Sequence, residues 1–337
     1  MKAWQKILIV AALATIVVVA GTIVYLNYGT KRRLFISTTT SLYDTGLLDA
    51  IEADYEASHP VDLSITAVGT GIAIQQAENG DADIVLVHAP STELMFLQGG
   101  YGVNRKIIAY NFFTIVGPAD DPAGISGKTA AEALTNIAIY GQNLADQSGQ
   151  TQIWVSRGDN SGTNSKEKNL WTASGYNYTE LSDAPWFAVT GQGMGATLTV
   201  ADQKEAYTLS DIGTYLKFST DGTISLDALI LEEQALLNVY SVMAVNTATV
   251  QANQSVHSEI NYNDAMDFIE YLISPATQQL INDFGKDTYG QPLFYEAAQA
   301  LKDNAPQPIV SWIQGYAFFE GSECPTQYRN GYEDLYS

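Results

Sequence analysis

One segment of this chain carries the strongest fold signal, Val155-Ser156-Arg157-Gly158-Asp159-Asn160-Ser161-Gly162-Thr163. It follows a short β-branched and aromatic run at 152–155, which predicts a strand. Gly158 to Gly162 predict a tight turn, and a helix is predicted to continue over 165–171. A strand that leads into a helix start rich in Ser, Gly and Thr presents free backbone N–H groups, hydroxyl donors and the positive end of the helix dipole. Arg157 adds a planar cation. All these groups donate hydrogen bonds, so the segment predicts a small-anion site, although an ordinary capped helix beside a surface arginine fits the same residues.

Two earlier segments repeat this order of strand, small polar residues and helix. The run Ser37-Thr38-Thr39-Thr40-Ser41 lies between a predicted strand at 34–36 and apolar residues at helical spacing over 47–55. Four or five consecutive hydroxyl residues exceed what helix capping requires. Gly69-Thr70-Gly71 follows the strictly alternating strand 61–67 and lacks the last glycine of a dinucleotide fingerprint. Both segments are therefore further candidates for anion contacts.

The rest of the pattern alternates strands with helices. A continuous apolar strand at 83–87, of the buried parallel type, ends at His88. A histidine at a strand end is more often a structural hydrogen-bonding residue than a ligand contact. Further strands are predicted at 112–118, 207–209 and 236–242, and helices at 130–140, after 191–195 and over 264–284 with a boundary at Ser274-Pro275. This alternation predicts an α/β protein with a largely parallel sheet, in which ligands sit at the carboxyl ends of the strands.

Composition excludes several classes of function. The 337 residues are 46% hydrophobic and 16% charged, which is a globular composition, and the length suits two domains. A formal net charge of −21 argues against nucleic-acid binding through the main body. The single cysteine, Cys324, excludes an internal disulfide, and His59, His88 and His257 are too scattered for a metal motif.

The two ends of the chain differ from the middle. An apolar run at 7–26 with basic residues on both sides is long enough to span a bilayer, and we expect 1–33 to be a retained membrane anchor. A cleaved signal peptide is the alternative, because Val18-Val19-Ala20 is a weak cleavage site. The tail from about residue 300 is aromatic, and its role stays open between packing on the body and binding a partner. Its aromatic residues are Trp312, Tyr316, Phe318, Phe319, Tyr328, Tyr332 and Tyr336.

Taken together, five of these segments resemble the tungstate-binding proteins of ABC importers. They occur in the order found in that family, and the likeness covers roughly residues 34–295. The five segments are Thr38-Thr39-Thr40-Ser41, Gly69-Thr70-Gly71, Gly80-Asp81-Ala82-Asp83 with Val87-His88-Ala89-Pro90, Ser156 to Thr163, and Ala206-Tyr207-Thr208-Leu209. The resemblance implies a type II periplasmic-binding-protein-like fold, with two α/β lobes of mixed, largely parallel sheets and a ligand cleft between the lobes. The implied parts are lobe 1 at 34–116 with its return at 236–299, lobe 2 at 117–235, and a C-terminal extension at 300–337. Ile212 departs from the polar residue expected there, outside the presumed contacts.

The same resemblance implies which residues contact the ligand. The implied ligand-binding residues are Thr39, Thr40, Ser41, Thr70 and Gly71 from the first lobe and Arg157, Ser161, Gly162 and Thr163 from the second. Asp159 is interpreted as a residue that orients Arg157, since a carboxylate facing a dianion would repel it. His88 is assigned to the same outer set, and no cofactor, metal or catalytic residue is expected.

Phosphate-binding relatives are the main alternative, because they share the Arg-x-Asp-x-Ser-Gly-Thr pattern. Phosphate carries a proton at neutral pH and needs an acceptor, which that family supplies as an aspartate where this chain has His88. Tungstate and molybdate are fully deprotonated, and an unpaired buried O–H costs about 1–3 kcal/mol. The sequence therefore favours tungstate or molybdate, unless the acceptor nitrogen of the imidazole faces the cleft.

Two other classes of protein fit the sequence less well. A hydrolase is disfavoured because Asn160 interrupts the protease-like Gly-Asp-Ser-Gly order and none of the histidines has a local catalytic signature. A surface interaction protein is supported only by the anchor and the aromatic tail. The expected protein is therefore not an enzyme. We expect a monomeric, membrane-tethered extracytoplasmic binding protein that captures an oxyanion, partners an ABC permease and binds no nucleic acid.

Overall fold

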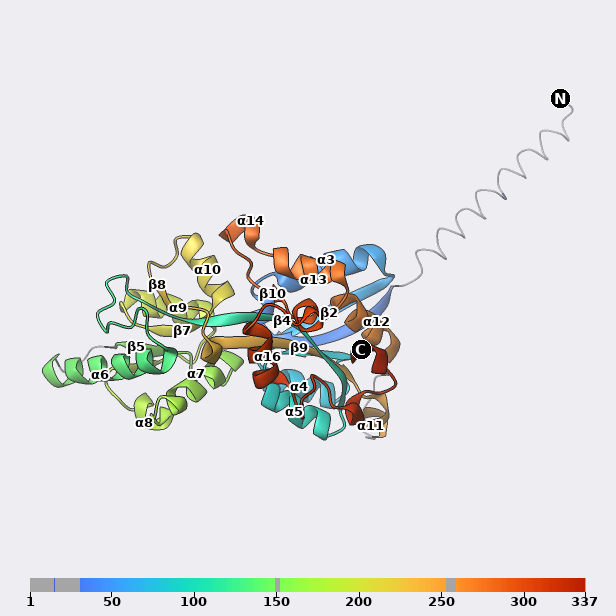
Figure 1. The fold of residues 1–337 in the computed structure, drawn as a ribbon, viewed down its shortest axis with the longest axis horizontal. Coiled ribbons are helices and arrows are strands. Elements are labelled where there is room, and N and C mark those ends of the chain that lie inside the picture. The colour runs from blue at the N-terminus through green and yellow to red at the C-terminus, as the bar shows by residue number, and fades with distance from the viewer. Residues whose placement is uncertain (1–14, 16–30, 149–151, 253–258, 337) are drawn as a thin grey trace, which may run out of the picture.

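Two long strands, β4 (Gly102–Gly117) and β9 (Leu237–Val245), run through the molecule and connect its two lobes (Figure 1). The computed structural model describes residues 15, 31–148, 152–252 and 259–336. One part of β4 pairs with β9 between Gly102 and Phe112, and its far end pairs with strands of the other lobe from Phe113 to Gly117. Every residue of both strands is buried, so the connection between the lobes is also the centre of the core.

The first lobe is built on the strand order β10-β4-β9-β3-β1-β2, with helices on both faces of the sheet (Figure 1). Leu34, Leu86, Val242 and Phe268 belong to one of its core clusters. Its elements are β1 (Arg32–Thr39), α2 (Thr40–Tyr43), α3 (Leu47–Ser58), β2 (Val61–Val68), α4 (Thr70–Glu78), β3 (Ile84–Val87), α5 (Pro90–Gln98), α11 (Thr247–Ala252), α12 (Tyr262–Leu272), α13 (Pro275–Asp283), α14 (Lys286–Tyr289) and β10 (Tyr295–Glu296).

The second lobe holds the predicted anion segment. Its parallel pair β5–β6 is extended by a bridge from Trp154 to Tyr207, and Trp154 and Trp171 pack edge to face in the core beneath it. Its elements are α6 (Ala130–Ser148), β5 (Trp154–Ser156), α7 (Gly162–Ala173), α8 (Tyr178–Ser182), β6 (Phe187–Val189), α9 (Met194–Gln203), β7 (Thr208–Asp211), α10 (Ile212–Thr220) and β8 (Asp227–Ile230), and the short helix η1 (Gln234–Leu236) leads back to β9.

The predicted α/β alternation is confirmed, and the sheet is mixed as expected. Its parallel share is smaller than predicted, because β1 pairs in parallel with β2 and β3 whereas every pair made by β4 or β9 is antiparallel. The reason lies in the topology. The chain leaves the first lobe along β4 and returns along β9, so neighbouring crossing strands run in opposite directions.

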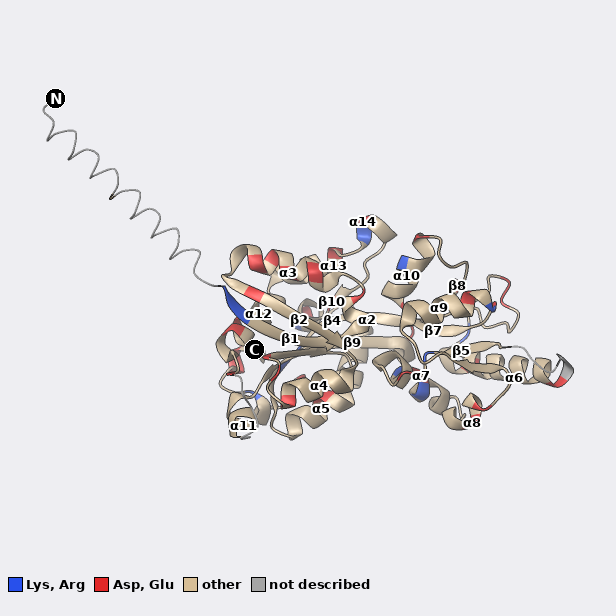
Figure 2. Cartoon of the chain, turned by 180° about the vertical axis from the view of Figure 1, so that it is seen from behind, with Lys and Arg blue, Asp and Glu red and all other residues tan. Residues whose placement is uncertain are grey.

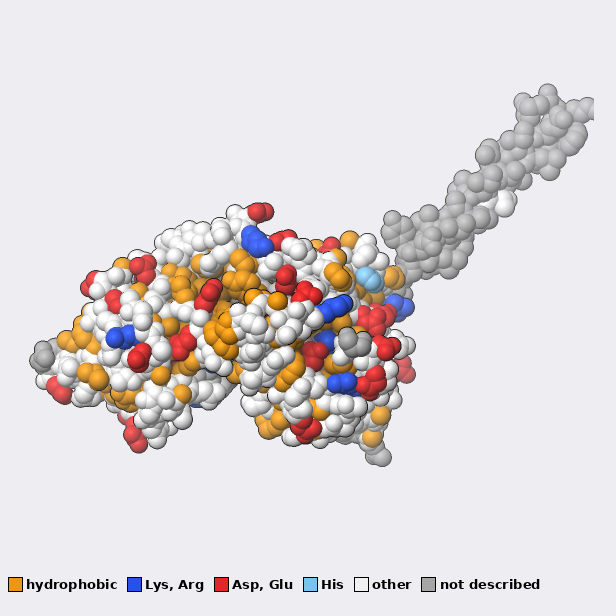
Figure 3. All heavy atoms as spheres, viewed as in Figure 1, with side chains coloured by type: hydrophobic (Ala, Val, Ile, Leu, Met, Phe, Trp, Pro, Cys, Tyr) orange, Lys and Arg blue, Asp and Glu red, His pale blue; other side chains and the backbone are white. Residues whose placement is uncertain are grey.

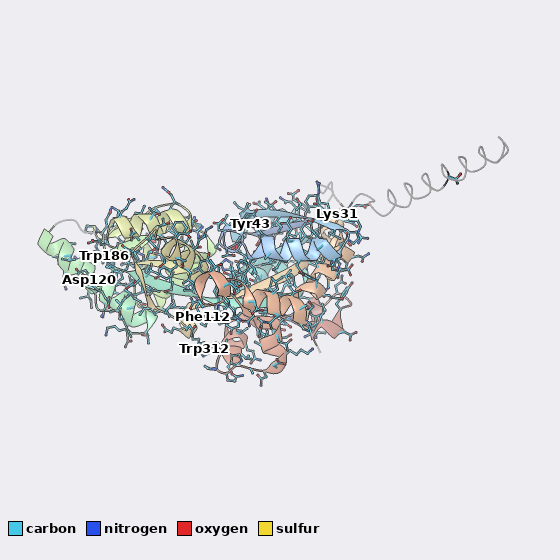
Figure 4. The ribbon with its side chains drawn as sticks, turned by 90° about the horizontal axis from the view of Figure 1, so that it is seen from above. Lys31, Tyr43, Phe112, Asp120, Trp186 and Trp312 are labelled. Carbon is cyan, nitrogen blue, oxygen red and sulfur yellow. The ribbon has the colours of Figure 1, made fainter. Side chains whose placement is uncertain are left out.

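The C-terminal extension packs on the body of the protein. It contains α15 (Ala297–Asp303), α16 (Ile309–Ala317), η2 (Thr326–Tyr328) and η3 (Glu333–Tyr336). Buried Arg105 of β4 pairs with Glu93 at 2.8 Å and donates to the carbonyl of Ala317, while Lys106 pairs with Glu323. Trp312 of α16 packs against the hydrophobic cluster that contains Phe112, and Figure 4 labels both residues.

The predicted apolar span at 7–26 lies outside the described residues apart from Thr15. Among the residues that the structure describes, none of the helices combines the length and the apolar character that crossing a membrane requires.

Candidate functional site

The carboxyl ends of three parallel strands bring the first-lobe residues together. Thr39 on β1 is in register with Val68 on β2, and Thr38 is in register with Leu86 on β3. The chain therefore places Thr39, Thr70 and His88 at one edge of the sheet, just after their strands end. Thr39, Ser41, Thr70 and His88 are all buried, whereas Thr40 is half-buried and Gly71 is exposed.

The hydroxyl of Thr70 is the most informative atom at this edge. Its Oγ1 is buried and has no hydrogen-bond partner among the described residues. An unpaired buried hydroxyl costs about 1–3 kcal/mol, so such groups in native proteins usually have a partner. Thr70 also begins α4, whose first backbone N–H groups have no partner within the helix. The free hydroxyl and the helix N-terminus together point to a hydrogen-bond acceptor at this position.

The predicted anion segment forms a tight loop before α7. Gly158 and Asn160 take left-handed backbone angles, with φ of 64° and 57°, and Ser161 caps the helix by accepting from the Asn164 N–H. Because the Ser161 oxygen accepts that bond, its hydroxyl proton remains available to a ligand. The residues that predict a turn in the sequence therefore form the loop that leads into the N-terminus of α7.

Arg157 is held in place from within this loop. Its Nε donates to Asp159 Oδ2 at 2.8 Å and its Nη1 lies 3.4 Å from Thr163 Oγ1. The other Asp159 oxygen accepts from the Ser161 N–H. Asp159 therefore lies where the sequence interpretation placed it, against the guanidinium. Arg157 is only 5% exposed, so its charge acts in a largely desolvated environment.

A buried carboxylate supports the loop from below. Glu167 of α7 accepts from Trp154 Nε1 at 2.7 Å, Ser156 Oγ at 2.8 Å and Asn164 Nδ2 at 3.3 Å. Burial raises the pKa of Glu167 to about 7, although these donors act in the opposite direction. The Asn164 side chain also accepts from the Asn160 N–H. The conformation of the loop is therefore fixed by a polar network that is itself buried.

The two lobes touch at the site. A Cβ atom on Gly162 would lie 2.8 Å from His88 Cε1, so only glycine allows this approach between α7 and the first lobe. A cavity of about 530 Å³ also lies between the lobes, with Tyr43-Asp44-Thr45-Gly46 on one side and Thr214, Lys217 and Phe218 on the other, and none of the predicted ligand-binding residues lines it. Figure 4 shows Tyr43 on the first-lobe side of the junction, and the space-filling view shows the molecule indented between the lobes (Figure 3).

His88 is held by polar contacts on both of its ring nitrogens. Its Nδ1 lies 2.8 Å from Asn238 Oδ1 and its Nε2 lies 3.3 Å from Ser41 Oγ. Burial lowers the pKa of His88 to about 4, the hydrogen bond to Asn238 opposes this, and the charges of Arg157 and Lys166 lower the pKa further. The imidazole is therefore neutral near pH 7 and contributes an acceptor. The sequence had left that possibility open.

Comparison with known proteins places these features in a family. A sequence model described as a PBP superfamily domain matches residues 27–276. The tungstate-binding protein TupA of Peptoclostridium acidaminophilum is 36% identical over 264 residues, which are 78% of this chain and 85% of that protein. The chain belongs to the PBP superfamily, within the TupA family.

Solved structures agree with this assignment. Tungstate-binding TupA from Desulfovibrio alaskensis G20 is 40% identical with a TM-score of 0.66, covering 79% of this chain and 98% of that one. The tungstate ABC transporter structure from Geobacter sulfurreducens is 40% identical with a TM-score of 0.63, covering 76% and 100%. A candidate ABC transporter anion-binding protein of Haloferax volcanii is 42% identical over 282 residues, or 82% of this chain and 75% of that protein. The predicted resemblance and two-lobed fold are confirmed.

Sequence reasoning missed three buried residues around the TupA-like site. Asn238 lies 150 positions from its partner His88, Lys166 donates to the Leu237 carbonyl at 2.9 Å, and Glu167 supports the loop. In the sequence, Lys166 and Glu167 are typical of solvent-exposed charges on a helix, and no signal in the sequence pairs Asn238 with His88. Leu237 and Asn238 are the first residues of β9, so the return of the chain to the first lobe along β9 creates the contacts with Lys166 and His88.

Proposed function

We propose that this TupA-family protein is an extracytoplasmic substrate-binding protein that captures tungstate or molybdate between its lobes and delivers it to an ABC permease. The observation that carries the proposal is the set of buried donors on both sides of the Gly162–His88 contact. Thr70 Oγ1 lies unpaired on the first lobe, and the Arg157 loop with the α7 N-terminus lies on the second. The names of the TupA relatives support the identity of the ligand.

The mechanism we propose is capture by lobe closure. Residues 34–116 and 236–299 form one lobe in this proposal, residues 117–235 form the other, and 300–337 is an extension. An anion held by Thr39, Ser41 and Thr70 alone would leave the lobes free to separate. Added contacts from Arg157 and the α7 N–H groups exist only when the lobes are closed, so the ligand stabilises the closed state by that difference.

The remaining parts of the proposal concern location and assembly. The 7–26 segment would tether a monomeric chain to the membrane on its extracytoplasmic side, or would be removed as a signal peptide. A binding protein of an importer needs access to the permease, which a tether provides. Mass analysis of the chain recovered from membranes would separate the two forms.

A hydrolase is less well supported, although Ser41, His88 and Asn238 are aligned like a nucleophile, a base and an orienting residue. A general base works best when its pKa lies near the working pH, and burial lowers that of His88 to about 4. The orienting group is a neutral amide, which stabilises an imidazolium less than a carboxylate does. We expect no hydrolysis of p-nitrophenyl acetate above the rate of a Ser41→Ala control.

Calorimetric titration with tungstate, molybdate, sulfate and phosphate tests the proposal. We expect tight binding of tungstate or molybdate and weaker binding of phosphate, because the phosphate O–H would have to compete with the Ser41 hydroxyl for the acceptor nitrogen of His88. Tight phosphate binding with no response to tungstate would promote the phosphate alternative. A chain that binds none of the four anions would contradict an oxyanion function altogether.

A further inference from the structure

The proposed site holds little free positive charge for a dianion. Arg157 is already paired with Asp159 at 2.8 Å. The fully buried carboxylate of Asp211 also feels the charge of Arg157, and burial raises the pKa of that carboxyl. Entry of two negative charges therefore calls for either strong dipoles or an additional cation.

A hydrogen-bond relay determines which ring nitrogen of His88 carries the proton. The relay begins at the backbone carbonyl of Leu293, which can only accept, and Asn111 Nδ2 donates to it at 3.3 Å. Asn111 Oδ1 consequently accepts from Asn238 Nδ2 at 3.0 Å, and Asn238 Oδ1 is left to face His88 Nδ1 at 2.8 Å. Nδ1 must therefore be the donor, and in the neutral ring Nε2 must be the acceptor.

This tautomer determines what the Ser41 hydroxyl can do. Ser41 Oγ has two acceptors for its single proton, His88 Nε2 at 3.3 Å and Thr39 Oγ1 at 3.4 Å. If the proton turns toward a bound anion instead, Nε2 becomes a buried acceptor without a donor. That loss is removed when Nε2 itself gains a proton, because Nε2–H can then donate to Ser41 Oγ.

We propose that His88 takes up one proton from solvent when a tetrahedral dianion binds, which makes it an additional cation of the site and releases the Ser41 hydroxyl to the ligand. The inference rests on the proposed function and adds a proton linkage to it. One N–H bond forms at Nε2, the proton comes from the buffer, and no other covalent bond changes. Nδ1–H keeps its bond to Asn238, so the ring needs no rotation.

The charges that face His88 explain why the ligand is required. Arg157 and Lys166 on the second-lobe side both lower the pKa of His88, and burial lowers it most. The Tyr240 ring of β9 stacks on the imidazole at 4.9 Å between ring centroids, and Asp211 lies near that phenol. Phe113 of β4 contributes only an aromatic face at 6.5 Å. A dianion beside Ser41 opposes the two cations and favours the imidazolium.

Calorimetry of the full chain in detergent micelles tests the linkage. Tungstate is titrated in two buffers of equal pH and ionic strength but very different ionisation enthalpies. We expect heats that differ between the buffers and that report uptake rising toward one proton per tungstate as the pH falls from 8 to 6. His88→Gln keeps an amide near Ser41 but cannot titrate, so the buffer dependence should disappear. His59→Gln removes a histidine that stacks on Tyr55 in the first lobe, and should leave the uptake unchanged.

Nitrogen NMR of the unmodified chain gives a readout that does not depend on a variant folding. Without ligand, His88 should show the neutral ring with the proton on Nδ1, and with tungstate both nitrogens should be protonated. Tight tungstate binding with equal heats in both buffers and a neutral ring would overturn the inference and leave the proposed function standing. Uptake that persists in a folded His88→Gln chain would place the proton elsewhere and also overturn it. No tungstate binding by the unmodified chain would instead overturn the proposed function.

Discussion

Replacing Thr70 by valine should change stability and ligand affinity in opposite directions. Valine has nearly the same shape and removes only the hydroxyl, which is buried and has no hydrogen-bond partner among the residues that the structure describes. Removing an unsatisfied buried hydroxyl should leave the free energy of unfolding unchanged or raise it by about 1 kcal/mol. In the complex, the same change deletes a bond to an anion, which is worth about 1.5–3 kcal/mol, so Kd for tungstate should rise roughly 10- to 150-fold.

The matched control is Thr38→Val, at the next-to-last residue of β1. Thr38 is fully buried, and its Oγ1 donates to the Leu86 carbonyl at 2.8 Å. That substitution should lower the free energy of unfolding by about 1–2 kcal/mol and change the tungstate Kd less than threefold. Denaturant unfolding without ligand and calorimetric titration measure the two quantities. A ligand contact at Thr70 is refuted if Thr70→Val binds tungstate within threefold of the unmodified chain, or if it destabilises the protein without ligand as much as Thr38→Val does.

Four further predictions concern three sets of substitutions and one competing anion. Arg157→Ala should weaken tungstate binding by roughly 30- to 150-fold in titration, because a charge-assisted bond in a buried site is worth about 2–3 kcal/mol, and a loss below threefold would mean the site is misplaced. Thr39→Val and Ser41→Ala should each lower affinity with folding preserved, and unchanged binding in both would leave the hydroxyl run as a helix cap. Phosphate at millimolar concentration should compete poorly with micromolar tungstate in an equilibrium assay, since its O–H has to be accommodated. Glu167→Gln should flatten the pH dependence of stability: a carboxyl whose pKa rises from 4.5 to about 7 on folding stabilises below pH 4.5 and loses that contribution, at most about 3 kcal/mol, as the pH rises to about 7. Urea melts across that range that remain parallel in the two proteins would exclude a role for this carboxyl.

The sequence was sufficient for the features that depend on local chemistry. The strict alternation at 61–67 predicted β2, and Ser274-Pro275 marked the boundary between α12 and α13, because proline is favoured at the first turn of a helix. The glycine and asparagine of the anion segment predicted a turn, and both adopt left-handed backbone angles. Each of these signals lies within a few residues of the structure that it specifies, so a single chain is enough to read them.

Contacts between distant segments could not be read in the same way. The strand predicted at 112–118 is only the far end of β4, which begins at Gly102, because polar Asn104, Arg105 and Lys106 interrupt the apolar pattern. Arg105 and Lys106 are buried against partners from the extension, including Glu323 more than 200 residues away, whereas Asn104 donates to Tyr262 of α12. Charge in a strand ordinarily indicates solvent, and only the tertiary partner reverses that interpretation. The tail predicted as aromatic is therefore also the element that satisfies these buried charges.

The formal net charge of −21 is compatible with a site for a dianion, because exposed charges are screened over long distances whereas the buried groups of the site act at short range. Acidic side chains are spread over both lobes in Figure 2, and in 0.1 M salt an exposed charge is largely screened beyond about 10 Å. Groups buried at the Gly162–His88 contact are screened much less, so the direction of their dipoles dominates there. Two of the carboxylates that interact with Arg157 already accept hydrogen bonds from other groups. Asp159 accepts from Arg157 and the Ser161 N–H, and Asp211 accepts from the backbone and the hydroxyl of Thr214. Both carboxylates thus already have hydrogen-bond donors as partners, and Arg157 and the N-terminus of α7 remain as donors for the ligand that we propose.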